Sequence, residues 1–225
     1  MSPRPAESDG ADLVERTALA IRDLLIDGRL RPGQQLVEPA LAAALGVSRN
    51  TLRESFRILM HEGLLLRHPN RGVFVHAPDV AEILDIYRVR RIIEEQAVRG
   101  AAPKHPGLAA VRAAVGQAVR LRDAGDWNGV GTENMRFHAA LVALADSPRL
   151  AELFARLQAE LRLAFVTLDS PEYLHDPFVD ENRRIVALLD DGRMGEAADA
   201  LDAYFTRSER TVLAAIERGR ATRPR

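Results

Sequence analysis

Apolar residues recur every three or four positions along most of the chain, which is the spacing of one face of an α-helix. This pattern predicts helices over residues 11–27 and 38–44, and a third helix that begins after Ser48, whose hydroxyl can cap the first turn. Two short apolar runs follow at 64–67 and 72–76, joined by the turn residues Pro-Asn-Arg-Gly. They predict a small β-hairpin.

From residue 80 onward the helical spacing continues without the alternation typical of a strand. Clusters of Pro, Gly and Asp separate the predicted helices, whose ranges are 80–101, 107–124, 128–145, 148–168, 177–190 and 194–219. Short connections between successive helices predict an antiparallel all-α bundle. In the breaker DSPEYLHDP we expect a loop, with His175 at the surface.

The fold class expected from these patterns is mostly α, with three helices and a hairpin followed by an all-α antiparallel bundle. Residues 11–76 would form the first domain, with the three helices and the hairpin, after a disordered tail over 1–10. A linker over 77–80 would lead to the helical domain, 81–219, and to a C-terminal tail, 220–225.

Composition restricts the possible functions. The formal net charge is −1, so attraction to a polyanion must come from a local patch. The absence of cysteine excludes disulfides, thiolate metal sites and a cysteine nucleophile. The N-terminus lacks an apolar signal segment, and no run approaches the roughly 18 apolar residues of a membrane helix. We therefore expect a cytoplasmic protein that is not bound to a membrane.

The third predicted helix has a basic outer face. Its apolar stripe consists of Leu52, Phe56, Leu59 and Met60, which leaves on the outer side Arg49, Asn50, Arg53 and Arg57. Arginine, asparagine and threonine side chains hydrogen-bond base edges and phosphates when the start of a helix enters a major groove. The partial positive charge of the helix N-terminus favours the same contact.

The tip of the predicted hairpin carries Arg71 and Gly72, which suit close approach to a phosphate or a minor groove. An ordinary solvated face with ion pairs along the helix is the alternative to DNA binding. The helix, turn, capped helix and hairpin together favour DNA binding.

The segment LRPGQQLVEPALAAALGVSRNTLRESFRILMHEGLLLRHPNRGVFV, residues 30–75, resembles the winged helix-turn-helix of the GntR family of bacterial transcription regulators. The resemblance is carried by PG, LA, GVSR, EGL and RG. It implies that operator DNA is contacted by Arg49, Asn50, Thr51, Arg53, Arg71 and Gly72. Pro39 departs from the family because many relatives carry a basic or polar contact residue there. Asn50-Thr51 also departs, which implies a different preferred operator.

Three later segments are similar to the FCD effector domain of the FadR subfamily: IYRVRRIIEEQAVRGAA, ENMRFHAALVALADSPRL and DENRRIVALLDDGRMGEAADALDAYF. The first contains the recurring arginine and glutamate, here Arg90 and Glu94. In many relatives this domain holds a divalent metal through an acidic residue and three histidines. The corresponding positions here are Asn134, His138, Asn182 and Tyr204.

Neutral amides and a phenol bind Zn²⁺ or Ni²⁺ poorly, so we expect no metal and no other cofactor. Weak metal binding through His138 and water is the alternative. In one interpretation the four side chains bind a small molecule whose carboxylate pairs with Arg90. In the other they satisfy one another or water. We favour the ligand, because polar groups clustered in an apolar bundle are costly unless partnered.

The combined interpretation is a transcription regulator, expected to be a repressor, that binds a palindromic DNA operator as a homodimer and responds to a small-molecule effector. Two half-sites roughly double the binding free energy of one small winged domain. An enzyme is not expected, since no Ser/His/Asp order, phosphate loop or HExxH motif is present. A constitutive DNA-binding protein with a structural bundle, or a metal-dependent regulator with a degenerate site, are the alternatives.

Overall fold

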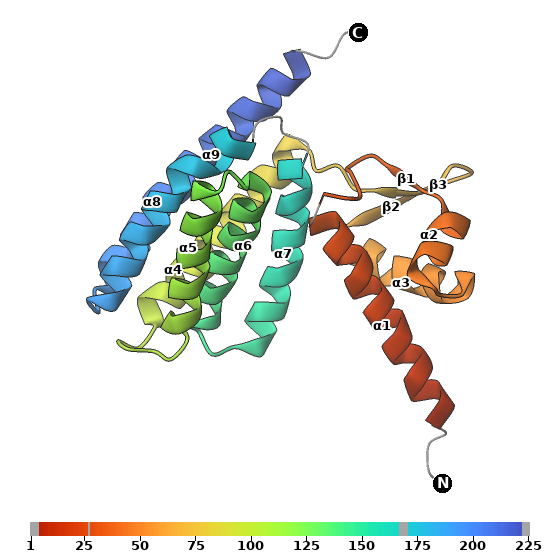
Figure 1. Cartoon of the computed structure of the whole chain (residues 1–225), viewed down its shortest axis with the longest axis horizontal. Coiled ribbons are helices and arrows are strands. Elements are labelled where there is room, and N and C mark those ends of the chain that lie inside the picture. Colours follow the sequence, from red (N-terminus) through yellow and green to blue (C-terminus); the bar gives the residue numbers. More distant parts are fainter. Residues whose placement is uncertain (1–4, 27, 167–170, 222–225) are drawn as a thin grey trace. The chain divides into compact units, whose positions relative to one another are not determined.

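The computed structural model describes residues 5–26, 28–166 and 171–221, and two compact units separate between Pro78 and Asp79 (Figure 1). The helices and strands of the first unit are α1 (Pro5–Ile26), β1 (Gln35–Leu36), α2 (Glu38–Leu45), α3 (Arg49–His61), β2 (Leu65–His68) and β3 (Gly72–Val75). The helices that follow in the chain are α4 (Val80–Gly100), α5 (Leu108–Asp123), α6 (Trp127–Ala143), α7 (Pro148–Val166), α8 (Pro171–Asp190) and α9 (Met194–Ala221). The expected mostly helical fold class is confirmed.

In the first unit, helices α1 and α3 pack against each other and bury their apolar stripes. Buried residues of this core include Ile21 and Leu25 of α1 with Leu52, Phe56 and Leu59 of α3. The strands form an antiparallel sheet in the order β1-β3-β2, with Leu36 opposite Val73 and Leu66 opposite Phe74. Strand β1 was not expected, because two residues are too short to show an alternating pattern.

The turn between α2 and α3 is built by local backbone chemistry. Gly46 ends α2 in the left-handed conformation, with φ 66°, which glycine adopts without steric cost. Ser48 caps α3 by accepting a hydrogen bond from the Thr51 amide at 3.1 Å. These two devices fix where α3 begins, and so place its first residues.

The helical boundaries differ most from the expected ones at two places. Helix α1 begins at Pro5, so residues 5–10, expected as a disordered tail, are helical; proline is tolerated in a first helical turn because its missing amide has no partner there. Helix α8 begins at Pro171 and contains Pro177. The breaker expected as a loop is therefore largely helical, because Leu174 and Phe178 bury one face of this segment. In addition, α9 runs to Ala221, into the expected C-terminal tail 220–225, of which residues 222–225 lie outside the described part of the chain.

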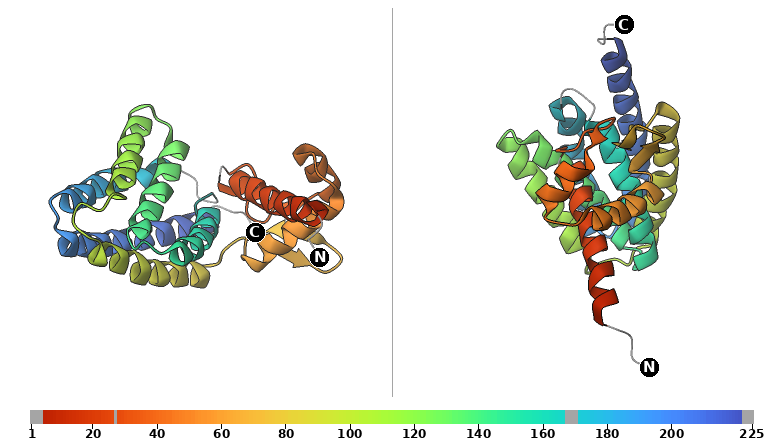
Figure 2. Two further views of the ribbon diagram at one scale, coloured as in Figure 1. Left: turned by 90° about the horizontal axis from the view of Figure 1, so that it is seen from below. Right: turned by 90° about the vertical axis from the view of Figure 1, so that its right-hand side faces the viewer.

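The second unit is a bundle in which α4 packs against α9, and α5 packs against both α6 and α8. Figure 2 shows α4 and α9 side by side. A capping box starts α4: Asp79 accepts from the Glu82 amide at 2.9 Å while Glu82 accepts from the Asp79 amide at 2.8 Å. Apolar side chains fill the interior around Phe137, Leu141, Leu201 and Phe205, all with 0% exposure.

Candidate DNA interface and buried polar network

The N-terminal part of α3 presents a polar, cationic face. Arg49, Asn50 and Arg53 are exposed, whereas Leu52 on the same turn is fully buried. Thr51 is only half-buried, and its hydroxyl shares a 2.8 Å hydrogen bond with the Ser48 hydroxyl at the helix cap. The side chains expected on the outer side of α3 are thus on the outer side.

Two arginines of this face have acidic partners. Arg53 Nε donates to Glu38 Oε2 of α2 at 2.8 Å, and Arg57 pairs with Glu54 at 2.8 Å. Among the described residues, Arg49 forms no hydrogen bond or ion pair. Exposed ion pairs contribute about 0–1 kcal/mol, so Arg53 can exchange Glu38 for a phosphate at little cost. Sequence reasoning missed Glu38, because nothing in the pattern brings it to Arg53.

The wing turn is held by a side chain from β1. Gln35 Nε2 donates to the Arg71 carbonyl at 2.6 Å, and the Arg71 guanidinium lies over the Phe74 ring, 5.6 Å from its centroid. Gly72 has φ 97°, and a Cβ there would come within 3.3 Å of Gln35 Nε2. The turn therefore requires glycine at position 72 and keeps Arg71 exposed at the tip.

The five expected effector residues lie close together inside the bundle, on α4, α6, α8 and α9. His138 Nδ1 is 2.5 Å from Glu94 Oε2, and His138 Nε2 is 3.0 Å from the Tyr204 hydroxyl. That hydroxyl also donates toward Asn134 Oδ1 at 3.2 Å, which accepts from Asn182 Nδ2 at 2.7 Å. Arg90 Nε completes the network by donating to Glu94 Oε1 at 2.8 Å.

Glu94 is the residue of this network that sequence reasoning did not place in the site. It is fully buried and lies between the guanidinium of Arg90 and the imidazole of His138. The only signal for Glu94 in the sequence was the resemblance to the FCD domain, in which a glutamate recurs four residues after the arginine. We name the set Arg90, Glu94, Asn134, His138, Asn182 and Tyr204 the polar network.

Burial and charge determine the protonation of the network. Burial lowers the pKa of His138 despite the adjacent Glu94 carboxylate, so the imidazole is neutral. Burial also raises the pKa of the Tyr204 phenol, which stays protonated. Burial opposes the charge of Arg90, but Glu94 outweighs it and the pKa of Arg90 is raised. A neutral imidazole next to a carboxylate donates from Nδ1 and can accept at Nε2. The single proton of the Tyr204 hydroxyl is then donated either to His138 Nε2 or to Asn134 Oδ1, but not to both at once.

Two buried atoms of the network lack a hydrogen-bond partner within the described part of the chain: Arg90 Nη2 and Asn182 Oδ1. The Arg90 guanidinium instead lies over the rings of Phe205 and Tyr87, at 4.9 and 5.5 Å from their centroids. Unsatisfied buried polar atoms are uncommon and cost free energy. These two are the places where a bound molecule could gain most.

The network does not fit a tightly held divalent metal. Both imidazole nitrogens of His138 are already engaged, one by Glu94 and the other by Tyr204. Among the described residues no three His, Cys, Asp or Glu side chains gather where they could hold a metal ion. His175, expected at the surface, is instead 5% exposed, because the helix that carries it starts at Pro171 and turns it inward.

Comparison with known proteins identifies both units. Residues 13–75 match the family described as bacterial regulatory proteins, gntR family, and residues 85–207 match the FCD domain. The chain belongs to the GntR family of transcription regulators. Its GntR DNA-binding domain is followed by an FCD domain, a combination consistent with the FadR subfamily. The resemblance found in the sequence is confirmed, and this GntR-family chain is a DNA-binding regulator, not an enzyme.

Relatives of this GntR-family chain support the same assignment over most of its length. It is similar to the Nta operon transcriptional regulator of Aminobacter aminovorans, 28% identical over 212 residues, 88% of this chain and 93% of that protein. A probable D-xylose utilization operon transcriptional repressor of Paenarthrobacter nicotinovorans is 28% identical over 193 residues, 83% and 85% of the two chains. The crystal structure of a putative GntR regulator from Rhodococcus sp. RHA1 has 39% identity and a TM-score of 0.86, covering 90% of this chain and 98% of that one.

Within the described residues, no helix of this regulator has the length and apolar character needed to cross a membrane.

Proposed function

We propose that this GntR-family protein is a homodimeric repressor that binds a palindromic operator and is controlled by a small carboxylate-bearing metabolite held in the FCD domain. Acting on chromosomal DNA, it would work in the cytoplasm. A relative named as a probable repressor of a sugar-utilization operon supports the repressor assignment. The operator should contain two half-sites related by a two-fold axis, because a dimer presents two copies of α3.

The observation that carries the DNA-binding part is the exposed start of α3. Arg49 is exposed and unpaired among the described residues, and it stands on the first turn of a helix whose amides are capped by Ser48. Its five donors are available for a guanine edge or a phosphate. We propose that Asn50, Thr51 and Arg53 act beside it, while Arg71 and Gly72 approach the DNA from the wing.

Replacement of Arg49 by Ala tests this assignment. It removes one base contact in each half-site, worth about 1–3 kcal/mol, so affinity for the operator should fall about 5- to 150-fold per half-site. Affinity for a scrambled duplex should change little, and the thermal midpoint should not change. The measurement is fluorescence anisotropy on both duplexes, with Arg183→Ala, an exposed arginine of α8, as the control of equal charge. Unchanged discrimination in Arg49→Ala would remove Arg49 from the base-reading set.

The observation behind the effector part is the pair of unsatisfied atoms in the polar network. A carboxylate can accept from Arg90 Nη2, and a donor group on the same molecule can reach Asn182 Oδ1. We propose that Asn134, His138 and Tyr204 reorient their mutual hydrogen bonds around this ligand. Glu94 already balances much of the Arg90 charge, so the carboxylate gains less from Arg90 alone. The ligand's affinity therefore depends on its contacts with both Arg90 and Asn182.

A thermal-shift screen of organic acids tests this part, because a ligand at 100 times its dissociation constant adds about 2.7 kcal/mol of stability. The hit should also alter operator affinity, and Asn182→Leu should abolish both effects. If no acid stabilises the protein, the result favours the alternative of a constitutive DNA-binding protein. In that alternative the polar network is purely structural, and its members satisfy one another through the hydrogen bonds already described.

We propose further that the network holds no tightly bound metal, because the amide, phenol and engaged imidazole groups leave no complete ligand set. Dialysis against a chelator should then leave the thermal midpoint unchanged. Zinc or nickel found by elemental analysis after mild purification, and lost on dialysis, would instead support weak binding through His138, whereas stoichiometric metal that survives dialysis would contradict the proposal.

A further inference from the structure

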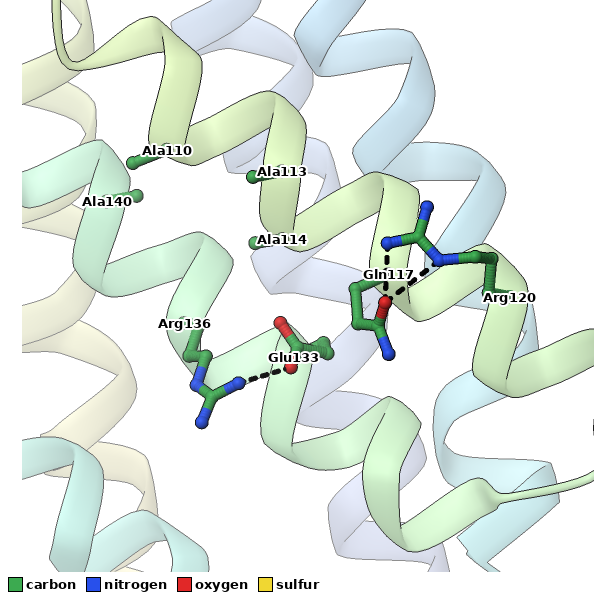
Figure 3. A pocket seen from close by; sticks show the side chains of 8 residues that line it. All are labelled: Ala110, Ala113, Ala114, Gln117, Arg120, Glu133, Arg136 and Ala140. Atoms are coloured by element: carbon green, nitrogen blue, oxygen red, sulfur yellow. Dashed lines mark hydrogen bonds and ion pairs between the residues drawn. The ribbon is translucent and has the colours of Figure 1, made fainter.

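A hollow of about 430 Å³ lies between α5 and α6 (Figure 3). It forms because the residues at positions i, i+3 and i+4 on the facing side of α5 are Ala110, Ala113 and Ala114, whose methyl groups leave space that longer side chains would fill. Ala140 of α6 extends this apolar wall. The volume falls within the roughly 300–1,000 Å³ of small-molecule sites. The hollow shares no lining side chain with the polar network, so the two are separate.

The carboxylate of Glu133 stands at the other end of the hollow and gives it chemical specificity. Glu133 is only 6% exposed, although it lines the hollow. Its Oε1 accepts from Arg136 Nη1 at 2.5 Å, and its Oε2 has no hydrogen-bond partner among the described residues. Figure 3 shows this second oxygen turned away from Arg136, toward the alanine side of the hollow. A largely buried carboxylate oxygen without a donor gains strongly from a charged donor that enters from outside.

Two guanidinium groups line the same hollow and have unused donors. The Arg136 side chain is 68% exposed and uses one of its five donors on Glu133. Arg120 directs Nε to Gln117 Oε1 at 2.9 Å and Nη2 to the same oxygen, which leaves Nη1 without a partner in the described part of the chain. Guanidinium groups bind carboxylates through paired hydrogen bonds. The hollow therefore offers an anion, cationic donors and an apolar wall to one small molecule.

We propose that this hollow binds a free α-amino acid with an aliphatic side chain. The ammonium group donates to Glu133 Oε2, the α-carboxylate accepts from the unused donors of Arg136, and the side chain covers the alanine methyl groups. A plain carboxylate is disfavoured because Glu133 repels it, and a plain amine leaves the guanidinium donors unused. A zwitterion meets both charges at once. The inference goes beyond the effector proposed for the polar network and does not depend on it.

Equilibrium dialysis of the full chain with L-leucine tests the proposal. A ligand of this size in an open hollow should bind once per chain, with a dissociation constant of about 0.1–1 mM. Isoamylamine is leucine without its carboxylate, and 4-methylpentanoate is leucine without its ammonium group. Each should bind about tenfold more weakly or worse, because each loses one charged contact. Equal binding of all three molecules would show that apolar contact alone holds them and would overturn the proposal.

Four variants test whether leucine occupies the hollow. Glu133→Gln keeps the shape of the side chain but removes the anion, so leucine binding should weaken about tenfold or more. Ala113→Leu fills the apolar end and should weaken binding similarly. Ala139→Leu, at an exposed position of α6 outside the hollow, is its matched control and should bind like the wild type. Asn182→Leu, in the polar network, should also leave leucine binding unchanged.

Glutamine and leucine are good helix formers, so the circular dichroism spectra of the three variants in α5 and α6 should match that of the wild type. No binding of leucine to the wild type, or unchanged binding to folded Glu133→Gln or Ala113→Leu, would overturn the site in the hollow while leaving the proposed regulator intact. Loss of leucine binding in Asn182→Leu would assign leucine to the polar network and would equally overturn the site in the hollow.

Discussion

Replacing Glu94 by Gln should destabilise the FCD domain strongly. The Glu94 side chain is 0% exposed and that of Arg90 is 3% exposed, so the guanidinium has no access to bulk water. Glutamine keeps the shape of the side chain but removes the only anion that pairs with Arg90 in the described network. Breaking a buried pair on one side costs about 3–5 kcal/mol, because the remaining charge is uncompensated.

That free energy corresponds to a fall of about 6–20 °C in the midpoint of the bundle, since 1 kcal/mol shifts a domain of this size by about 2–4 °C. Differential scanning calorimetry of the full chain measures it as a shift of the bundle transition. The double variant Arg90→Met/Glu94→Leu is the control, because replacing a buried ion pair by apolar groups is often neutral or stabilising. A Glu94→Gln midpoint within 2 °C of wild type would refute a buried, uncompensated Arg90 charge.

Two further predictions concern pH and DNA discrimination. The pKa of His138 is lowered by burial from its ordinary value of 6.5, so its contribution to stability is present above pH 6.5 and is lost as pH falls below it. Urea unfolding between pH 7.5 and 5 should therefore show a loss of up to about 1.4 kcal/mol per pH unit that His138→Leu lacks; equal slopes would exclude His138 as the cause. Glu38→Gln releases Arg53 from its 2.8 Å ion pair and should raise affinity for scrambled DNA severalfold, with a steeper salt dependence. Equal salt slopes in the variant and wild type would show that Glu38 does not restrain Arg53.

The sequence was most informative about which side chains of a single helix are buried and which are exposed. The apolar stripe of α3 determined which of its residues are buried, and the exposed positions of Arg49 and Arg53 followed from it. Helical spacing within α6 likewise put Asn134 and His138 on one face. Their meeting with Asn182 and Tyr204 was implied by family resemblance, and the hydrogen bonds between them are in the structure.

Tertiary contacts were the part that the pattern could not provide. Glu94 meets His138, 44 positions away, and Glu38 meets Arg53 through the angle between two short helices. The start of α8 was also predicted wrongly. The prolines at 171 and 177 indicated a loop, although apolar residues between and beside them are buried in the bundle. In each case the contact or boundary depends on packing between different helices, which the spacing of apolar residues within one helix does not encode.

Selection of binding sites from a random duplex library tests the central claim, sequence-specific recognition by the start of α3, most directly. The account predicts that the wild-type protein enriches one palindrome with half-sites about one helical turn apart, and that Arg49→Ala loses the preference at the base pairs that Arg49 contacts. Enrichment of no sequence by the wild type, or of the same palindrome by Arg49→Ala, would contradict it.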